Sequence, residues 1–171
     1  QPPARAKVQP ALLAWQTLNW QGRQLANSGT LQGDKQLELK GDALLNQGTL
    51  AGGDGLTLQA DTLNNEGRIA SQLATLAGRQ LRSSGTLLGV SRLTLTGDEL
   101  ALTGQQLTDG ELELGSRLLQ LSGQSLVGGQ ARVGRQLTET NRAVLADRTH
   151  ARQHLLLGVG LQLLRDQARI L

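Results

Sequence analysis

Aliphatic and polar residues alternate along this chain, and the alternation returns at a nearly constant interval. Alternation with a period of two is typical of a β-strand that buries one side. Successive copies are 19, 18 and 19 residues apart, and they read Leu37-Glu-Leu39, Leu56-Thr-Leu58, Ala74-Thr-Leu76 and Leu93-Thr-Leu95. The pattern predicts short strands in a fixed repeat, with no helix inside the repeat.

A polar corner accompanies these strands. It follows the template L-x-[N/S]-x-G-[T/R]-[L/I], and its glycines are 19, 19 and 18 residues apart. The four copies cover residues 25–31, 44–50, 63–69 and 81–87. The third repeat is one residue shorter than the others, and all later elements shift with it. Corner and strand therefore belong to one repeating unit.

One such unit is too small to bury a core alone, whereas stacked units bury a shared one. If each repeat is one turn of a coil, equivalent residues lie about 4.8 Å apart, as neighbouring strands do in a sheet. Two inner columns are then expected, Leu31-Leu50-Ile69-Leu87 and Leu39-Leu58-Leu76-Leu95. The sequence predicts an all-β fold, a parallel β-helix (solenoid) of about 19-residue turns.

The corner residues have separate expected roles. We expect the glycine to supply a positive φ angle, and the preceding asparagine to bond to its copies in the turns above and below. The alternative fold is an antiparallel meander with a hairpin at each corner. A two-residue Asn-Gly hairpin needs the two residues to be adjacent, and here one residue always intervenes. The β-helix is therefore the preferred fold.

The composition agrees with a regular interior. The chain has 171 residues with no Phe, Tyr, Met or Cys, and its aromatic residues are Trp15 and Trp20. Columns of uniform aliphatic side chains do not need aromatic rings to fill irregular volumes. About nine turns fit this length, which gives a rod roughly 40 Å long.

Three regions are predicted. Residues 1–22 contain all three prolines and form a lead-in or N-terminal cap, and residues 23–100 form regular β-helix repeats. Residues 101–171 are degenerate repeats, with a shortened corner at 107–112 and further corners at 141–145 and 167–170. A helical cap is the alternative for 137–171, because that segment is rich in helix-forming residues.

The repeat resembles that of filamentous haemagglutinin, found in the exoproteins of bacterial two-partner secretion. The resemblance rests on LANSGTLQGDKQLELKGD, LLNQGTLAGGDGLTLQADTLNN and LNNEGRIAS, and it is specific over residues 23–100. It implies a right-handed parallel β-helix, export by an outer-membrane two-partner secretion transporter, and a secreted location at the bacterial cell surface. The group includes adhesins and the toxin-delivery proteins of contact-dependent growth inhibition.

The resemblance implies a structural function: a shaft segment of a large filamentous protein that presents a distal adhesive or toxin domain to a receptor or glycan on other cells. The secretion motifs and toxin region of that group are not found here, and no signal peptide opens the chain. We therefore expect an internal segment of a longer protein. Its longest apolar run, residues 155–164, is too short for a membrane span.

Arginine is concentrated late in the chain. Residues 1–116 carry nine Lys+Arg and eleven Asp+Glu, whereas residues 117–171 carry eight Arg and three acidic residues. A solvated face is the simpler interpretation, and an adhesive module for a polyanionic glycan or lipopolysaccharide is the alternative. The candidate binding residues are Arg117, Arg132, Arg135, Arg142, Arg148 and Arg152. Nucleic acid is not expected as a partner, because aromatic residues that would stack on bases are lacking.

Acidic residues recur at one position of the repeat. Asp42, Asp61 and Asp98 share this position, with Arg79 between the last two. Carboxylates are ligands for calcium, but charges of alternating sign in a stack indicate an exposed charge ladder instead.

Motifs for catalysis or metal binding are incomplete. His150 and His154 have the spacing of a helical metal pair, but Ala151 stands where a zincin motif has its glutamate. The stretch GQSLV at 123–127 lacks the last glycine of a nucleophile elbow. Enzymes on a β-helix build their sites from long loops, for which the repeats before residue 100 leave no room. We expect no enzymatic activity, cofactor or metal.

Overall fold

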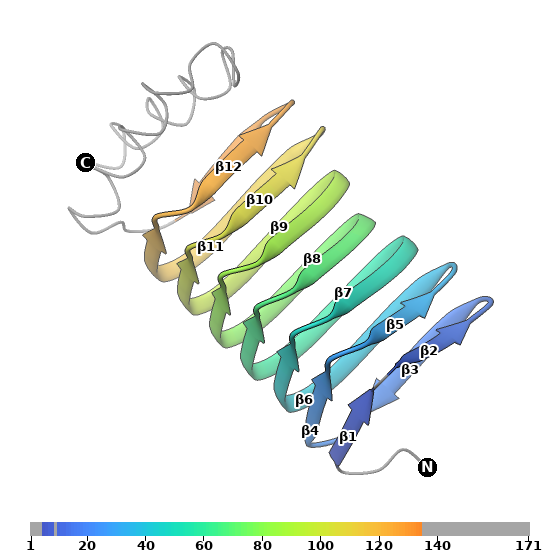
Figure 1. Ribbon diagram of the computed structural model, residues 1–171. Coiled ribbons are helices and arrows are strands. Elements are labelled where there is room, and N and C mark those ends of the chain that lie inside the picture. Colours follow the sequence, from blue (N-terminus) through green and yellow to red (C-terminus); the bar gives the residue numbers. More distant parts are fainter. Residues whose placement is uncertain (1–4, 9, 135–171) are drawn as a thin grey trace.

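The computed structural model describes residues 5–8 and 10–134. They form a parallel β-solenoid of about 7 turns, with coils stacked about 19 residues apart (Figure 1). The prediction of an all-β, parallel β-helix is confirmed. The estimate of nine turns included residues 135–171, which lie outside the described residues, as does the choice between coil and cap for 137–171.

The strands of the described residues pair in parallel throughout. In chain order they are β1 (Arg5–Val8), β2 (Ala11–Ala14), β3 (Thr17–Gln21), β4 (Gln24–Asn27), β5 (Thr30–Gly33), β6 (Gln36–Asn46), β7 (Thr49–Asn65), β8 (Arg68–Ser83), β9 (Thr86–Leu102), β10 (Gln105–Thr108), β11 (Glu111–Leu121), β12 (Gln124–Val127) and β13 (Ala131–Gly134).

Each coil has three sides, which β7 illustrates because it runs through all of them. The first side, 49–52, follows the corner glycine; the second is 55–60; and the third, 62–65, ends at the corner asparagine. Residues on each side pair with residues one coil away, in most places 19 positions along the chain. Successive coils thus place the same template position at the same point of the cross-section.

The short repeat is absorbed at the outer bend between the first and second sides. The register shifts between Gly52 and Gly55, and in the next coil between Ser71 and Leu73. Gln72 therefore stands alone where each neighbouring coil has two residues. Its Nε2 donates to Ser91 Oγ at 2.8 Å on the surface. Because the lost residue lies at a bend, the inner columns stay aligned.

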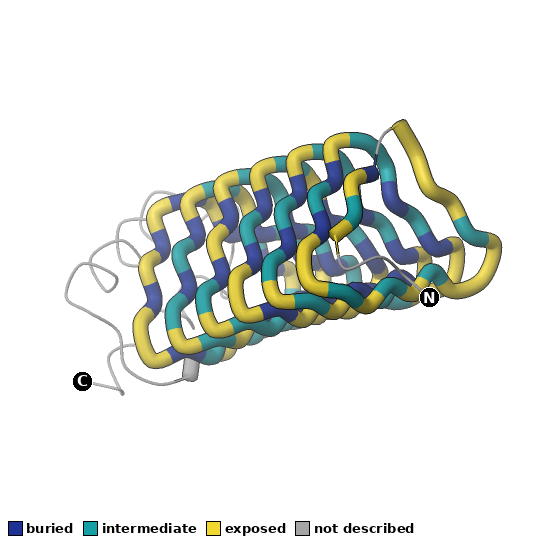
Figure 2. Tube along the Cα trace, turned by 90° about the horizontal axis from the view of Figure 1, so that it is seen from below, coloured by how far each residue is buried: buried dark blue, intermediate teal, exposed yellow. Residues whose placement is uncertain are grey.

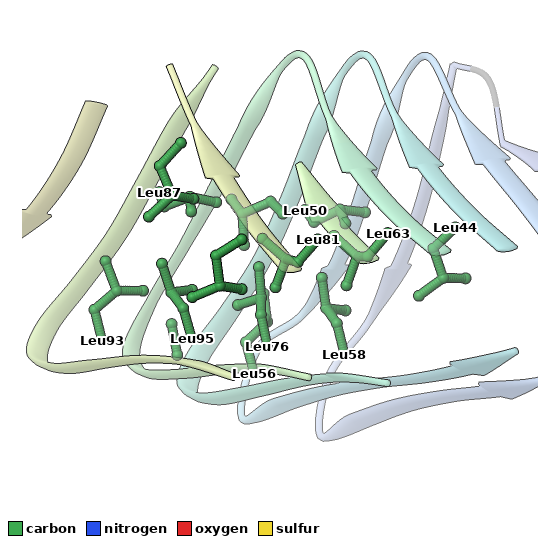
Figure 3. Close-up of a cluster of buried hydrophobic side chains, with 14 of the residues drawn as sticks. Leu44, Leu50, Leu56, Leu58, Leu63, Leu76, Leu81, Leu87, Leu93 and Leu95 are labelled. Carbon is green, nitrogen blue, oxygen red and sulfur yellow. The ribbon is translucent and has the colours of Figure 1, made fainter. Parts of the chain in front are cut away.

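The core is a continuous stack of aliphatic side chains along the inside of the solenoid (Figure 3). The residues of both predicted columns are exposed by 2% or less, and they are Leu31, Leu50, Ile69, Leu87, Leu39, Leu58, Leu76 and Leu95. From β4 onward, buried residues alternate with more exposed ones along the sides of the coils (Figure 2). Each buried leucine contributes about 1.5–3 kcal/mol, so the predicted columns account for much of the stability.

Residues 5–21, within the predicted lead-in or cap, form strands of their own. β1, β2 and β3 pair with β4, β5 and β6 at the same offset of 19 residues. Trp20 pairs with Leu39 in register and packs partly buried against the core. Leu12 stands in the column of Leu31 but is 48% exposed, because no described coil lies beneath it.

Candidate functional site

The asparagines of the corners form a buried hydrogen-bonded ladder. Asn27 Nδ2 donates to Asn46 Oδ1 at 2.8 Å, and Asn46 Nδ2 donates to Asn65 Oδ1 at 2.8 Å. Asn65 Nδ2 donates to Ser83 Oγ at 3.2 Å, so that serine continues the ladder. The predicted bonding between copies is confirmed, and all four side chains are almost fully buried.

Each ladder asparagine also ties two corners together. Asn46 Nδ2 lies 3.1 Å from the carbonyl oxygen of Gly48 in its own corner and 3.1 Å from that of Arg68 in the next. Buried carbonyl groups without a partner are costly. The asparagine is therefore the structural reason that a tight corner can be buried between leucines.

The corner glycines are needed for a reason other than the predicted one. None of the corner glycines Gly29, Gly48, Gly67 and Gly85 has a φ angle in the left-handed region, so the expected positive-φ corner is wrong. Instead, a Cβ added to Gly67 would overlap the carbonyl oxygen of Gly48, and one added to Gly48 would overlap that of Gly29. Stacked corners approach too closely for any side chain.

The ladder ends at Ser83. In the following two coils, a different pair of buried polar side chains lies in the column that contains Leu87. Leu102 takes the ladder position and is buried, while Gln106 replaces the leucine of the Leu87 column. Ser125 Oγ donates to Gln106 Oε1 at 2.9 Å, and Gln106 Nε2 has no partner in the described residues. A buried hydrogen-bonded Ser125 also explains why GQSLV presents no exposed nucleophile.

The corner of this coil is at Gly104, not in the shortened form predicted for 107–112. Gly104 contacts Gly85 below, Gly123 contacts Gly104, and both follow the 19-residue spacing. The corner at Gly104 does not fit the template, because Leu102 stands at its Asn/Ser position and Gln106 at its Leu/Ile position. The spacing of 19 residues after Gly85 was the signal that would have found them.

The predicted charge ladder lies on the surface. Asp42, Asp61, Arg79 and Asp98 are all exposed and follow one another in register. Arg23 extends the ladder at one end, 4.0 Å from the Asp42 carboxylate. Exposed pairs of this kind contribute at most about 1 kcal/mol. In the part of the chain that the structure describes, no three His, Cys, Asp or Glu residues are grouped so that they could hold a metal ion.

Two of the six candidate arginines lie in the described residues, and both stand near acidic residues. Arg117 Nη2 lies 3.8 Å from Glu99 Oε1, with the arginine side chain 65% exposed. Arg132 is exposed and pairs in register with Glu113. The other four, Arg135, Arg142, Arg148 and Arg152, lie outside the described residues, as do His150 and His154.

The third side of the solenoid carries a hollow of about 730 Å³. It spans four coils, from β7 to β11, and its outward side chains are Asn64, Gln80, Arg82, Ser84, Glu99, Ala101, Thr103, Leu118 and Gln120. No motif pointed to it, since it depends on which outward side chains are small or polar in successive coils. Writing the repeats under one another would have placed Ala101 between Arg82 and Gln120.

The described residues contain no helix long and apolar enough to cross a membrane. Comparisons with protein-family profiles, curated proteins and solved structures find no match to this chain.

Proposed function

We propose that this chain is a shaft segment of a large secreted filamentous protein, which holds a distal adhesive or toxin domain away from the bacterial cell. The observation that carries the proposal is the uninterrupted core. One continuous cluster of buried aliphatic side chains runs through the stacked coils from β1 to β13, and neighbouring coils provide the contacts. In such a structure the number of coils sets the distance between the two ends, and adding coils increases that distance.

The finer assignment is to the filamentous haemagglutinin repeats of two-partner secretion. It is supported by the residues that carry the resemblance, because the template asparagine and glycine are the ones that make the corners. Export by an outer-membrane transporter and a cell-surface location belong to this proposal. Coils that contact mainly their neighbours are suited to folding one after another as a chain emerges, and no disulfide has to form, since the chain has no cysteine.

A coil deletion in the full-length parent protein tests this function. Removing residues 30–48 joins Gly29 to Thr49, which occupies the position of Thr30 in the next coil. We expect surface display and the activity of the distal domain to persist. The control deletion of 30–38 removes about half a coil, breaks the register and should abolish display. Normal display with loss of the distal activity after the 30–48 deletion would contradict a spacer role.

An adhesive role for the Arg-rich second half is the second candidate. Residues 5–134 hold eleven Lys+Arg and eleven Asp+Glu, so the net charge of +3 arises from the six Arg and three acidic residues of 135–171. A positive excess confined to one segment favours contact with a polyanionic glycan or lipopolysaccharide. We expect retention on heparin that falls with salt and is lost in R142Q/R148Q/R152Q. If retention did not fall with salt, or if the R142Q/R148Q/R152Q variant were retained as well as the unchanged chain, this role would be refuted.

A further inference from the structure

The hollow on the third side lies over Ala101, a small residue between two longer ones in its outward row. Arg82 pairs with Ala101 in register, and Ala101 pairs with Gln120. All three side chains point outward, so the methyl group of Ala101 leaves space between its two long neighbours. Stacked coils fix the spacing of this row at about 4.8 Å per step. The hollow is therefore a fixed feature of the backbone and needs no movement to form.

Polar groups surround this space on both sides. Gln80 and Glu99 stand on one edge, and Ser84 and Thr103 on the other. No side-chain hydrogen bond or ion pair joins Arg82, Gln80 or Gln120 to another of the described residues, so their side-chain donors and acceptors are free for a ligand. A site with amide, hydroxyl and guanidinium groups around an aliphatic floor matches a ligand with many hydroxyl groups.

The charges in the hollow select the kind of ligand further. Glu99 lines the hollow, and its carboxylate lies 3.8 Å from the guanidinium of Arg117, which stands outside the hollow. Arg82 is exposed and has no such partner among the described residues. A planar guanidinium binds a carboxylate through two parallel hydrogen bonds. The ligand should therefore carry a carboxylate on a hydroxyl-rich body.

Leu118 completes the site with an apolar surface. It stands beside Glu99 in register and is 39% exposed. Together with Ala101 it offers an aliphatic patch against which the C–H face of a sugar ring can pack. A volume of about 730 Å³ lies within the usual range for small-ligand sites, about 300–1,000 Å³.

We propose that the hollow lined by Arg82, Ala101 and Gln120 binds an acidic sugar, a uronic acid unit of an oligosaccharide. Arg82 holds the carboxylate, the amides and hydroxyls bind the sugar hydroxyls, and Leu118 packs against the ring. This site lies within the described solenoid and is separate from the Arg-rich segment beyond it. It requires neither export nor a shaft function, so the two proposals stand or fall separately.

Calorimetric titration of the 171-residue chain with trigalacturonate tests the site, with the uncharged methyl ester of the same trisaccharide as a matched ligand. We expect saturable binding of the acid and binding of the ester at least about tenfold weaker, since hydrogen bonds to a charged group are lost. Equal binding of acid and ester would overturn the role of Arg82. Absence of binding at millimolar ligand would overturn the site.

Four variants locate the binding. R82Q should weaken binding of the acid by about tenfold or more, and A101W should abolish it by filling the hollow. The controls are R68Q, an exposed arginine on the first side, and A26W, which stands in the same outward row as Ala101 but outside the hollow. Circular dichroism and melting temperature confirm that each variant is folded. Undiminished binding by folded A101W, or equal losses in A26W, would refute the site.

Discussion

Two adjacent asparagines show how differently one residue type is used in this fold. Asn65 is buried and shares the ladder with Asn46 and Ser83, whereas Asn64 points outward and makes one side-chain bond, to Glu66 at 3.4 Å. In the pair Asn64-Asn65, the first residue therefore lies on the surface, and the second belongs to the buried ladder. Their substitution provides a matched comparison.

We expect Asn65→Ala to lower the free energy of unfolding by about 2–3 kcal/mol, because Asn46 loses its acceptor and the corner carbonyl groups lose a donor in a buried place. Asn64→Ala should change it by about 0.5 kcal/mol or less. Urea unfolding followed by circular dichroism measures both. Equal effects of the two substitutions would mean that the ladder does not stabilise the corners.

A second comparison tests the stacking of the corners. Gly67→Ala places a methyl group against the Gly48 carbonyl oxygen, and we expect a loss of about 3 kcal/mol or more. Gly55→Ala is the control, since its added Cβ meets nothing closer than 3.6 Å, and it should be neutral or stabilise by about 0.5 kcal/mol. Thermal unfolding of the two variants decides. If Gly67→Ala were as stable as Gly55→Ala, the corners would not be in contact.

Much of this residue-level arrangement could be predicted. The inner columns and the asparagine ladder follow directly from the repeat, because equivalent residues must stack once the turn length is known. The role of the corner glycine could not be assigned from the sequence. A positive φ angle and the close approach of a neighbouring backbone both require glycine, so the two causes give the same residue. Only the position of the Gly48 carbonyl beneath Gly67 separates them.

At the scale of the coil, the unit of folding is one complete turn of 19 residues. Because strands pair only with the coils above and below, removing a whole coil leaves every remaining pair intact. The 171-residue chain without residues 30–48 should keep its β-sheet circular dichroism and unfold cooperatively. Deletion of 30–38 instead shifts leucines from inside to outside, and we expect an unfolded or aggregated product. Solubility and circular dichroism of the two deletions test this, and a folded 30–38 deletion would contradict it.

Prediction was weaker for the coils after residue 100. In the coil of Gly104, Leu102 is apolar where the earlier coils have Asn or Ser, and Gln106 is polar where they have Leu or Ile. Each coil thus keeps one apolar and one polar residue at these two inner positions, so the core continues although the template no longer matches. The hollow around Ala101 was beyond prediction for a different reason. Outward positions are not constrained by packing in the core, and whether they form a hollow depends on side chains up to three coils apart.

At the scale of the whole molecule, each coil adds one strand spacing to the solenoid. The length of the solenoid is therefore set by its number of coils. The described residues show a single continuous core without a break between coils. A spacer function depends on this property, because the position of a distal domain is then fixed by the number of repeats. The chain has no cysteine, so two introduced cysteines can carry spin labels at chosen coils.

Thr57→Cys and Arg132→Cys place labels on the second side, four coils apart in register. Double electron–electron resonance should give a backbone separation of about 19 Å, and insertion of a second copy of residues 86–104 after Gly104 should raise it to about 24 Å. An unchanged distance, or a change unrelated to one strand spacing, would contradict the account of the chain as a stack of equivalent coils.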